Sequence, residues 1–520
     1  MNVSLTDLVK RRSPCKPHPA FCFCAQLRST IEPRLIAKRQ APEPGILLPS
    51  KVGCNLQITS RLSCLVLGES HREHLKEVFV QEMARGLEGK PSEPSSLFME
   101  DTFLPDLPNG KEEGDFLALD LGGTNLRVLL ITLKAGQILE YYTVPECIRY
   151  GHGSALFDFL ASSVESFLKK RNLNSNKYNM GEAGCVLLTR GFTFSFPIHH
   201  RSLRSGELIK WSKSFNCPGV VGQDVVALLE EALARRKLDN IAVVAILNDT
   251  TDHQCAMGLV LGTGSNCCYV EKPENFKKQS NGNDTTKLKV LNVEWGAFGD
   301  NGVLNFMRTQ WDISVDRKSL LAGSFTFEKY FGGKCLGDLV RECLVTLAEE
   351  GLFCTGPSET LRTVGSLHTS QVSTLDGEGL IGRVKETEEI LQALGLCYTE
   401  KDVKIAQYVA GLFSYRGVVL ISVCNNIDTN FTPPVTATLL QKMERPHVVI
   451  AIDGSLYEFH PRFRPLMIKL IGDMAPDHTV SRHFSNNLKK LYEFELRLSR
   501  DGSGKGAALV AAIASRCASE

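Results

Sequence analysis

The sequence has no feature that would assign it to a membrane or to a nucleic acid. No uninterrupted apolar run is long enough to span a bilayer. The formal net charge is +1 over 520 residues, so neither sign is in large excess. Without an excess there is no bulk electrostatic attraction to nucleic acid or to an anionic membrane. We therefore expect neither a nucleic-acid partner nor a transmembrane segment, whereas a small polyanion needs only a few local donors.

The pattern of cysteines indicates neither a disulfide framework nor a zinc site. The 17 cysteines are scattered over the chain, and several lie inside apolar runs, as Cys343 does. Neither the Cys22–Cys24 pair nor the adjacent Cys267 and Cys268 has a second pair or a histidine at zinc spacing. Buried reduced thiols are typical of a cytosolic protein. We therefore expect a cytoplasmic location and no structural zinc.

The first 62 residues show no sustained helical or strand period. They are rich in Lys and Arg, and seven prolines between Pro14 and Pro49 disfavour an amphipathic helix. A transit peptide is one interpretation of this bias. We favour a disordered extension over residues 1–62, without a counterpart in related proteins, and expect order to begin near Leu65.

Strands that lead into glycine turns recur along the chain. An apolar strand, a glycine turn and a second apolar strand cover residues 116–133, and the same layout returns over 257–270. A further strand over 448–453 runs into small residues. Amphipathic helices lie between them, over 155–170 behind Ser154 and over 225–236 behind Asp224. Alternating strands and helices predict an α/β protein, and the repeated turns predict two related lobes around a nucleotide cleft.

The first glycine turn, Asp120–Asn125, has the residue types of a phosphate cradle. Its two glycines let backbone N–H groups approach a phosphate closely, and Thr124 adds a hydroxyl donor. Asp120 is placed to hold a Mg²⁺ ion through its waters. A tight hairpin needs glycine as well, so one such turn is weak evidence. Gly262–Ser265 and Asp453–Ser455 are further turns of small residues with the same arrangement. The three turns together favour a phosphate site.

A fourth glycine-rich run, Gly502–Gly506, is not a Walker A phosphate loop. That loop needs a glycine five residues before its Gly-Lys pair and Ser or Thr after it. Ser499 and Gly506 occupy these two positions. We expect the alanine-rich residues 507–514 to form a packed C-terminal helix instead.

Polar side chains follow the predicted buried strand over 241–247. The carboxyl end of this strand delivers Asn248 and Asp249 into a cleft. A carboxylate there can accept the proton of a hydroxyl group whose oxygen attacks phosphorus. An Asx turn or a helix N-cap is the alternative. Side chains that can pair with the hydroxyl groups of a sugar lie in other segments: Ser195, Ser212, Lys213, Asn266 and Glu294.

From about Leu65 to its C-terminus the sequence resembles the eukaryotic-type hexokinases. The shared motifs are Asp-Leu-Gly-Gly-Thr-Asn at 120–125, Gly-Phe-Thr-Phe-Ser-Phe-Pro at 191–197, Ile-Leu-Asn-Asp-Thr at 246–250, Gly-Thr-Gly-Ser-Asn at 262–266, Glu-Trp-Gly-Ala-Phe-Gly at 294–299, Phe-Glu-Lys at 327–329 and Asp-Gly-Ser-Gly-Lys-Gly at 501–506. The resemblance implies the two-lobed fold shared with actin and the heat-shock chaperone ATPases. We expect a large lobe of residues 65–104 and 248–502, and a small lobe of 105–247 with the C-terminal helix 503–520.

The same resemblance implies an activity and the residues for it. The activity is phosphorylation of a free hexose, glucose foremost, at the 6-hydroxyl by MgATP, the first step of glycolysis, with Asp249 as the base. Sugar contacts are implied for Ser195, Phe196, Ser212, Lys213, Asn248, Asp249, Asn266, Glu294 and Glu328. Contacts with ATP are implied for Asp120, Leu121, Gly122, Gly123, Thr124, Asn125, Arg127, Thr263, Gly333, Lys334, Thr369, Ser370, Gln371, Val372, Ser373, Ser455, Leu456, Tyr457, Glu458 and Phe459, and Asp120 is also the implied magnesium ligand.

The sequence departs from the family pattern in several places. Ser212 stands where the family usually has threonine. After Thr250 the family continues with a short segment that contains Gly-Thr and begins a helix, whereas here residues 251–253 (Thr-Asp-His) follow at once. Residues 425–436 and about 480–494 resemble insertions. We expect the short connection after Thr250 to slow turnover.

Two other classes of protein compete with a hexokinase. A catalytically weak or silent relative would bind sugar as a sensor or regulator, and the short connection favours it. A chaperone-type ATPase would share the fold but lack the sugar residues. The partners that we expect are a hexose and MgATP. Weak association with mitochondria is an alternative that the sequence leaves open, although the apolar N-terminal anchor of the family is not seen at Met1.

Overall fold

The structure is a computed structural model that describes residues 56–89, 92–105, 112–123, 125–133, 136–171, 190–238, 241, 243–247, 257–278, 288–424, 447–474, 493–499 and 502–519. The predicted disorder of residues 1–62 is wrong at its end, because Leu56–Arg61 form helix α1 and Ile58 is fully buried. The rest of that prediction, for residues 1–55, lies outside the described residues, as do nearly all of the two suspected insertions.

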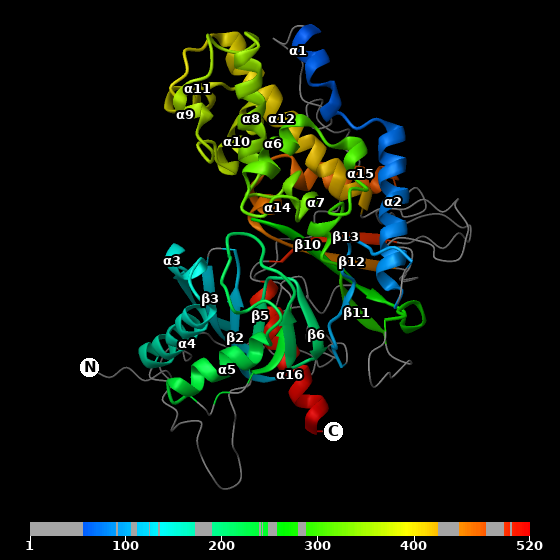
Figure 1. Cartoon of the computed structure of the whole chain (residues 1–520), viewed down its shortest axis with the longest axis vertical. Helices are drawn as coiled ribbons and strands as arrows, with labels where there is room; N and C mark the ends of the chain where they lie inside the picture. The colour runs from blue at the N-terminus through cyan, green and yellow to red at the C-terminus, as the bar shows by residue number, and fades with distance from the viewer. Residues whose placement is uncertain are drawn as a thin grey trace, which may run out of the picture. The chain divides into compact units, whose positions relative to one another are not determined.

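The first sheet has five strands in the order β4-β3-β2-β5-β8. β2 and β3 form an antiparallel hairpin, and β5 runs parallel to both β2 and β8. Helices α4 and α5 lie on one face of this sheet, and α16 lies on the other (Figure 1). These elements are β2 (Gly114–Leu121), β3 (Asn125–Leu133), β4 (Gly136–Thr143), β5 (Arg190–Phe194), β8 (Val243–Leu247), α3 (Glu146–Arg149), α4 (Gly153–Lys170), α5 (Val225–Arg235) and α16 (Gly502–Ser519).

The two faces of β2 are both apolar and belong to different cores. Leu117 and Leu119 pack with α4 and α5, whereas Phe116 and Ala118 pack with α16. Because side chains alternate along a strand, Asp120 lies on the α16 face. This helix approaches β5 so closely that a Cβ on Gly191 would be 2.1 Å from the Ala507 carbonyl oxygen. The close contact places the N-terminus of α16 near the end of β2.

The second sheet has six strands in the order β1-β11-β10-β9-β12-β13. β9 and β10 form an antiparallel hairpin, and β12 runs parallel to β9 and β13. The segment Val448–Tyr457 is therefore a strand followed by a helix, and not a third hairpin. These elements are β1 (Glu100–Asp101), β9 (Met257–Leu261), β10 (Ser265–Glu271), β11 (Lys289–Asn292), β12 (His447–Asp453), α14 (Ser455–Phe459) and β13 (Glu493–Leu498). A separate hairpin of β6 (Ile198–Ser202) and β7 (Ser205–Leu208) lies between β5 and β8 in the chain.

Helices dominate the chain between β11 and β12. α12 is central, and it contacts α2, α8, α10 and α15. By length and composition α12 could cross a membrane, but its apolar stretch is entirely buried, as in a core helix of a folded protein. The helices outside the first sheet are α2 (Glu69–Leu87), α6 (Gln310–Lys318), α7 (Thr326–Lys329), α8 (Leu336–Glu349), α9 (Glu359–Arg362), α10 (Thr369–Ile381), α11 (Lys385–Ala393), α12 (Glu400–Cys424) and α15 (Phe463–Met474).

The predicted helix starts are correct at one of two positions. Asp224 caps α5, because its carboxylate accepts hydrogen bonds from the backbone N–H groups of Val226 and Ala227. The predicted start of α4 is wrong by two residues, since His152 and not Ser154 precedes its first turn. The predicted C-terminal helix is confirmed as α16, although it begins earlier, at Gly502. Gly502–Gly506 thus form helical turns.

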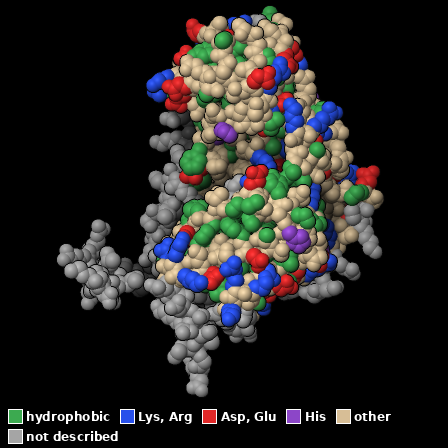
Figure 2. Space-filling view, turned by 60° about the vertical axis from the view of Figure 1, so that its left-hand side comes forward, with side chains coloured by type: hydrophobic (Ala, Val, Ile, Leu, Met, Phe, Trp, Pro, Cys, Tyr) green, Lys and Arg blue, Asp and Glu red, His purple; other side chains and the backbone are tan. Residues whose placement is uncertain are grey.

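The surface carries charges of both signs. Figure 2 shows one face of the molecule, on which Lys and Arg side chains are interspersed with Asp and Glu side chains and hydrophobic side chains lie between them. This distribution agrees with the formal net charge of +1.

Candidate active site

The three glycine turns that the sequence singles out lie against one another. A Cβ on Gly123, in the turn between β2 and β3, would be 3.2 Å from Cγ2 of Thr263 in the turn between β9 and β10. Gly454 has a positive φ of 118°, and a Cβ there would be 2.3 Å from the Leu261 carbonyl oxygen. Glycine is therefore required where the ends of β9 and β12 approach each other. Two sheets and three distant segments meet in one place.

The loop before α8 is bonded to the turn between β9 and β10. The backbone N–H of Gly333 donates to Gly262 O at 2.8 Å, and that of Lys334 donates to Thr263 O at 3.0 Å. Thr369, the first residue of α10, donates its hydroxyl hydrogen to Gly333 O at 2.6 Å. The predicted ATP residues of three segments are thus one connected set.

Two carboxylates and one guanidinium lie beside the first turn. Asp120 is fully buried and is ion-paired with Arg127 on the neighbouring strand. Asp453, at the end of β12, accepts a hydrogen bond at 3.0 Å from the backbone N–H of Gly502, the first residue of α16. Burial raises the pKa of Asp453 to about 6, while Arg127 opposes this rise and the charge of Asp120 reinforces it. The site therefore holds two acidic groups of which one ionises less readily than usual.

The predicted sugar carboxylate Glu328 lies directly against the turn between β9 and β10. Its Oε2 accepts a hydrogen bond at 3.1 Å from the backbone N–H of Ser265. A Cβ on Gly264 would be 2.6 Å from that oxygen, and one on Gly296 would be 3.1 Å from it. Both glycines therefore make room for the carboxylate. Burial raises the pKa of Glu328, and the Ser265 N–H and the charge of Lys213 act against this rise.

Asn266 and Glu294 belong to a buried amide and carboxylate cluster. Asn266 Nδ2 donates to Asn292 Oδ1 at 2.7 Å and to Glu294 Oε1 at 3.3 Å. Asn292 Nδ2 donates to the same Glu294 oxygen at 2.8 Å. The three side chains orient one another, as a group that binds sugar hydroxyls must.

Ser195, Phe196, Ser212 and Lys213 come from the loops that follow β5 and β7. Lys213 Nζ donates to the Ser195 carbonyl oxygen at 2.8 Å and lies 5.6 Å from the centre of the Phe196 ring. That ring is 1% exposed and packs between Trp211 and Phe215. A sugar contact from Phe196 would therefore have to come from its backbone. Ser212 is also buried, at 4% exposure.

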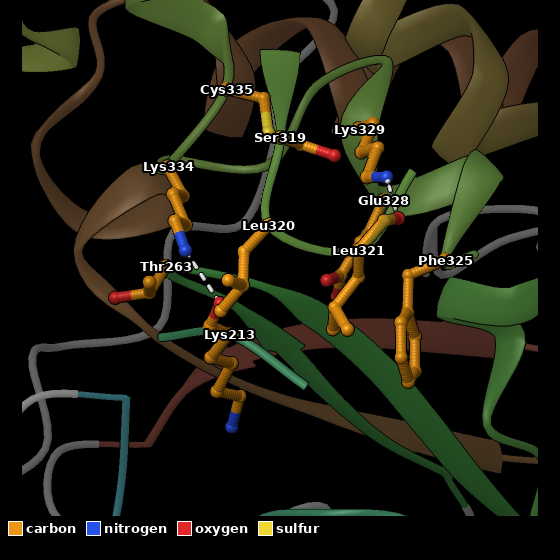
Figure 3. A pocket seen from close by; sticks show the side chains of 10 residues that line it. All are labelled: Lys213, Thr263, Ser319, Leu320, Leu321, Phe325, Glu328, Lys329, Lys334 and Cys335. Carbon is orange, nitrogen blue, oxygen red and sulfur yellow. Dashed lines mark hydrogen bonds between the residues drawn. The ribbon is translucent and has the colours of Figure 1, made fainter. Parts of the chain in front are cut away.

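A pocket joins the two sets of predicted residues. It encloses about 420 Å³, including its open mouth, and its lining contains Lys213 and Glu328 of the sugar set with Thr263 and Lys334 of the ATP set. Figure 3 shows these side chains around the pocket, with Leu320, Leu321 and Phe325 on another part of the wall.

Two residues that line this pocket, Lys213 and Phe325, have strained backbone conformations, as does Glu294 of the buried cluster. Lys213, Glu294 and Phe325 all adopt the left-handed conformation, with φ of 59°, 54° and 57°. This conformation is unfavourable for residues other than glycine, and it persists where surrounding contacts hold it. At Phe325 the backbone N–H donates to Asp300 Oδ2 at 3.1 Å, and the Lys210 ammonium lies 4.2 Å from the ring centre.

Several predicted residues stand apart from this cluster or lie outside the described residues. Thr124, Asn248 and Asp249 are outside them, so the roles assigned to these three stay predictions. Phe459, at the end of α14, is 71% exposed. The remaining predicted ATP residues lie in the first turn of α10, in α14, or beside the first glycine turn: Ser370, Gln371, Val372, Ser373, Ser455, Leu456, Tyr457, Glu458, Leu121, Gly122 and Asn125.

Sequence reasoning missed several residues of the site. Asn292 was not predicted, although its spacing from Glu294 places both at the end of one strand and is a readable signal. Asp453 was predicted only as part of a turn. Ser214 and Lys210 reach the site through tertiary contacts for which a single sequence carries no signal.

Known proteins resemble the chain over nearly all of its length. Two family models described as hexokinase match residues 57–256 and 256–513. Hexokinase-3 of Homo sapiens is 35% identical over 531 residues, which cover 97% of this chain and 53% of that protein. Hexokinase-1 of Bos taurus is 34% identical, with 97% of this chain and 54% of that protein covered. The chain thus spans about half the length of these curated relatives, and the similarity extends into the N-terminal residues that we expected to have no counterpart.

A solved structure supports the same assignment. A hexokinase from Schistosoma mansoni complexed with glucose superposes with a TM-score of 0.74 at 31% identity, covering 88% of this chain and 98% of that one. A second hexokinase structure gives a TM-score of 0.66 at 28% identity. The predicted two-lobed, actin-like sugar kinase fold is therefore confirmed. The motifs, the fold and the relatives agree, and the chain belongs to the hexokinase family.

Proposed function

We propose that this protein transfers the terminal phosphoryl group of MgATP to the 6-hydroxyl of a free hexose, with glucose as the preferred substrate. The reaction is the first step of glycolysis. Membership of the family supports the proposal. The similar hexokinase from Schistosoma mansoni, which is complexed with glucose, supports the choice of sugar.

The observation that carries the proposal is the double role of the turn between β9 and β10. The Thr263 carbonyl oxygen holds the loop of the predicted ATP residues, while two residues later the Ser265 N–H holds the predicted sugar carboxylate Glu328. A donor phosphate bound at one side of this turn and a hydroxyl bound at the other would be neighbours. Holding two reactants side by side is a large part of catalysis in phosphoryl transfer.

The sugar would be held by oriented hydrogen bonds. Glu294 and Asn266 would each accept or donate to ring hydroxyls from a buried cluster, and Glu328 would accept from another. Such a site rejects ligands that lack a hydroxyl, because its buried polar groups are then left unpaired. Asp249 would accept the proton of the 6-hydroxyl as that oxygen attacks phosphorus.

The acidic pair beside the first glycine turn fits a magnesium ion. Mg²⁺ prefers carboxylate oxygen ligands and retains part of its water shell. Asp120 and Asp453 provide such oxygens close to the turns that would hold the phosphates, and their mutual repulsion contributes to the raised pKa of Asp453. When bound, the ion would neutralise charge on the phosphate oxygens. Asp120 and Asp453 would then orient the nucleotide through the waters of the ion.

The second candidate function is that of a sugar-binding sensor with little turnover. The short connection between Asp249 and β9 favours this candidate, because it shortens the segment that must place the base. The complete sugar and ATP sets favour the enzyme.

We also propose a cytoplasmic location. The ten cysteines whose side chains the structure describes are free thiols, as in proteins of reducing compartments. Weak binding to mitochondria is the alternative, and cell fractionation distinguishes the two.

A coupled assay for ADP release tests the proposed function. Purified protein with MgATP should release ADP only when a hexose is added, and glucose, fructose and mannose compared at equal concentration identify the preferred sugar. A sensor would instead be stabilised by glucose against heat without releasing ADP. Absence of both sugar-dependent ADP release and sugar binding would refute the proposal.

A further inference from the structure

The side chain of Lys334 contacts a different loop from the turn that its own backbone contacts. The backbone N–H of Lys334 is bonded to Thr263 O at 3.0 Å, on the predicted nucleotide side. Its ammonium donates to the carbonyl oxygen of Lys213 (Figure 3) and, at 2.9 Å, to the hydroxyl of Ser214. Lys334 therefore joins the predicted nucleotide turn to the loop that carries a predicted sugar lysine.

The loop that receives this contact is strained and depends on such support. Lys213 has a φ of 59°, a conformation that costs free energy for any residue with a Cβ. Its own ammonium donates to the Ser195 carbonyl oxygen at 2.8 Å. A continuous series of hydrogen bonds thus runs from Ser195 through Lys213 and Lys334 to Thr263.

The other end of the same loop is tied in a similar manner. Lys210 Nζ lies 3.1 Å from Asp300 Oδ2, and Asp300 also accepts hydrogen bonds from the backbone N–H groups of Phe325 and Thr326. The segment 210–214 is consequently held at both ends by residues of the chain between β11 and α8. Of these two attachments, the one through Lys334 also reaches the turn between β9 and β10.

We propose that Lys334 is a positioning residue that couples hexose binding to nucleotide binding. By holding Lys213 in its strained conformation, it preorganises the sugar loop while the Thr263 turn is in place. An ammonium has three N–H donors, so two can serve Lys213 and Ser214 while one meets a phosphate oxygen beside Thr263. Each ligand then favours the arrangement that the other needs, and the coupling must be reciprocal. The inference rests on the proposed function of the same site.

The bond to Ser214 separates this coupling from a simple contact between Lys334 and ATP. Ser214→Ala removes one acceptor of the ammonium and leaves the positive charge unchanged. Lys334→Met removes the whole attachment, and Ser214→Thr keeps a hydroxyl and should restore most of the effect. Ser319→Ala is the matched control, because Ser319 lines the same pocket but donates to Asp316 O at 2.7 Å and not to Lys334.

Isothermal titration measures the coupling directly. Glucose affinity is determined with and without a non-hydrolysable MgATP analogue, and analogue affinity with and without glucose. We expect the parent to show the same coupling factor in both directions. That factor should fall about threefold in Ser214→Ala and about tenfold in Lys334→Met, the size of losing one and two hydrogen bonds to a charged group that is partly exposed. Analogue affinity without glucose should not change in Ser214→Ala.

Each other outcome counts against the inference. If Ser214→Ala behaves as Ser319→Ala does, or if Lys334→Met weakens the analogue equally with and without glucose, Lys334 is a nucleotide contact and no more. If the parent binds glucose but shows no coupling, the inference fails and the proposed function stands. If the parent binds no glucose, both fail. Melting temperatures of all variants within a few degrees of the parent exclude unfolding as the cause.

Discussion

The two glycine hairpins, β2–β3 and β9–β10, have nearly the same sequence layout but contribute different groups to the site. In each, a strand enters a turn of three residues and a second strand returns, and each turn is closed by a backbone hydrogen bond of 3.0 Å, from Gly122 to Asn125 or from Gly262 to Gly264. The turn between β2 and β3 is open at Gly122, where a Cβ would meet only the Asn125 oxygen at 3.6 Å, whereas a Cβ on Gly123 would be 3.2 Å from Thr263 Cγ2. The turn between β9 and β10 is enclosed, and it contacts Gly333, Lys334 and Glu328.

The difference shows how one local motif acquires two functions. The first hairpin contributes charged side chains to its surroundings, Asp120 and Arg127. The second contributes backbone groups, whose hydrogen bonds join the sugar and nucleotide residues. Under the proposed function, we therefore expect nucleotide binding at both turns and sugar binding at the second turn but not at the first. The chemistry depends on what each turn contacts, and the turn sequence itself is common to both.

The largest effect on activity is expected from Asp249, which belongs to neither hairpin. β8 ends at Leu247, next to the predicted base Asp249, which belongs to the connection between the two hairpins' sheets. Asp249→Ala should lower the rate of phosphoryl transfer by about 10²- to 10⁴-fold, since a general base is lost. Glucose binding should be only weakened, because the second hairpin still holds the sugar. Turnover near that of the parent in a coupled assay would exclude Asp249 as the base.

The connection between the sheets provides the next prediction. Nine residues, 248–256, link β8 to β9, and the family resemblance leads us to expect a longer segment there. Inserting a family-like segment with Gly-Thr after Thr250 should raise turnover by up to about 10²-fold, the loss that a misplacement of about 1 Å can cause. kcat is compared at saturating MgATP and glucose, with an inserted Gly-Ser segment of the same length as control. Equal and rapid turnover by the parent would show that the short connection is harmless.

A smaller effect is expected from Asp453, the carboxylate at the end of β12 that lies beside Asp120 and Arg127 of the first hairpin. The folded-state pKa of Asp453 is raised to about 6, above the ordinary value for aspartate. The neutral carboxyl is therefore favoured by folding, and its contribution to stability is present at low pH and lost as the pH rises through 6. Asp453→Asn should reduce this decline between pH 4 and 7, while MgATP should stabilise the parent more strongly above pH 6.

Denaturant unfolding of both proteins at several pH values checks the prediction. A parallel pH dependence of the free energy of unfolding in Asp453→Asn and the parent would assign the decline to other groups.

The parts of the fold that were predicted correctly are those with a local sequence pattern. Both hairpins, the strand at β12, the Asp224 cap and the C-terminal helix follow from glycine turns, apolar periods and a capping residue, all of which are local. Because the sequence contains three such turns, we expected them to form one phosphate site, although no pattern indicated which of their residues would be in contact. Asn292, Ser214 and Lys210 were missed because their roles depend on tertiary neighbours far away in sequence. Helix α1 (Leu56–Arg61) was missed because six residues carry too little periodicity.

The most direct test of the division between the hairpins is the affinity for glucose of two matched glycine variants. Gly264→Ala places a methyl group where a Cβ would be 2.6 Å from Glu328 Oε2, whereas Gly122→Ala meets no atom closer than 3.6 Å. Isothermal titration should show glucose affinity reduced at least about tenfold in Gly264→Ala, because the sugar carboxylate is displaced. Glucose affinity in Gly122→Ala should stay within about twofold of the parent. Equal glucose affinities in the two variants would contradict the claim that, of the two hairpins, only the second contributes to the sugar site.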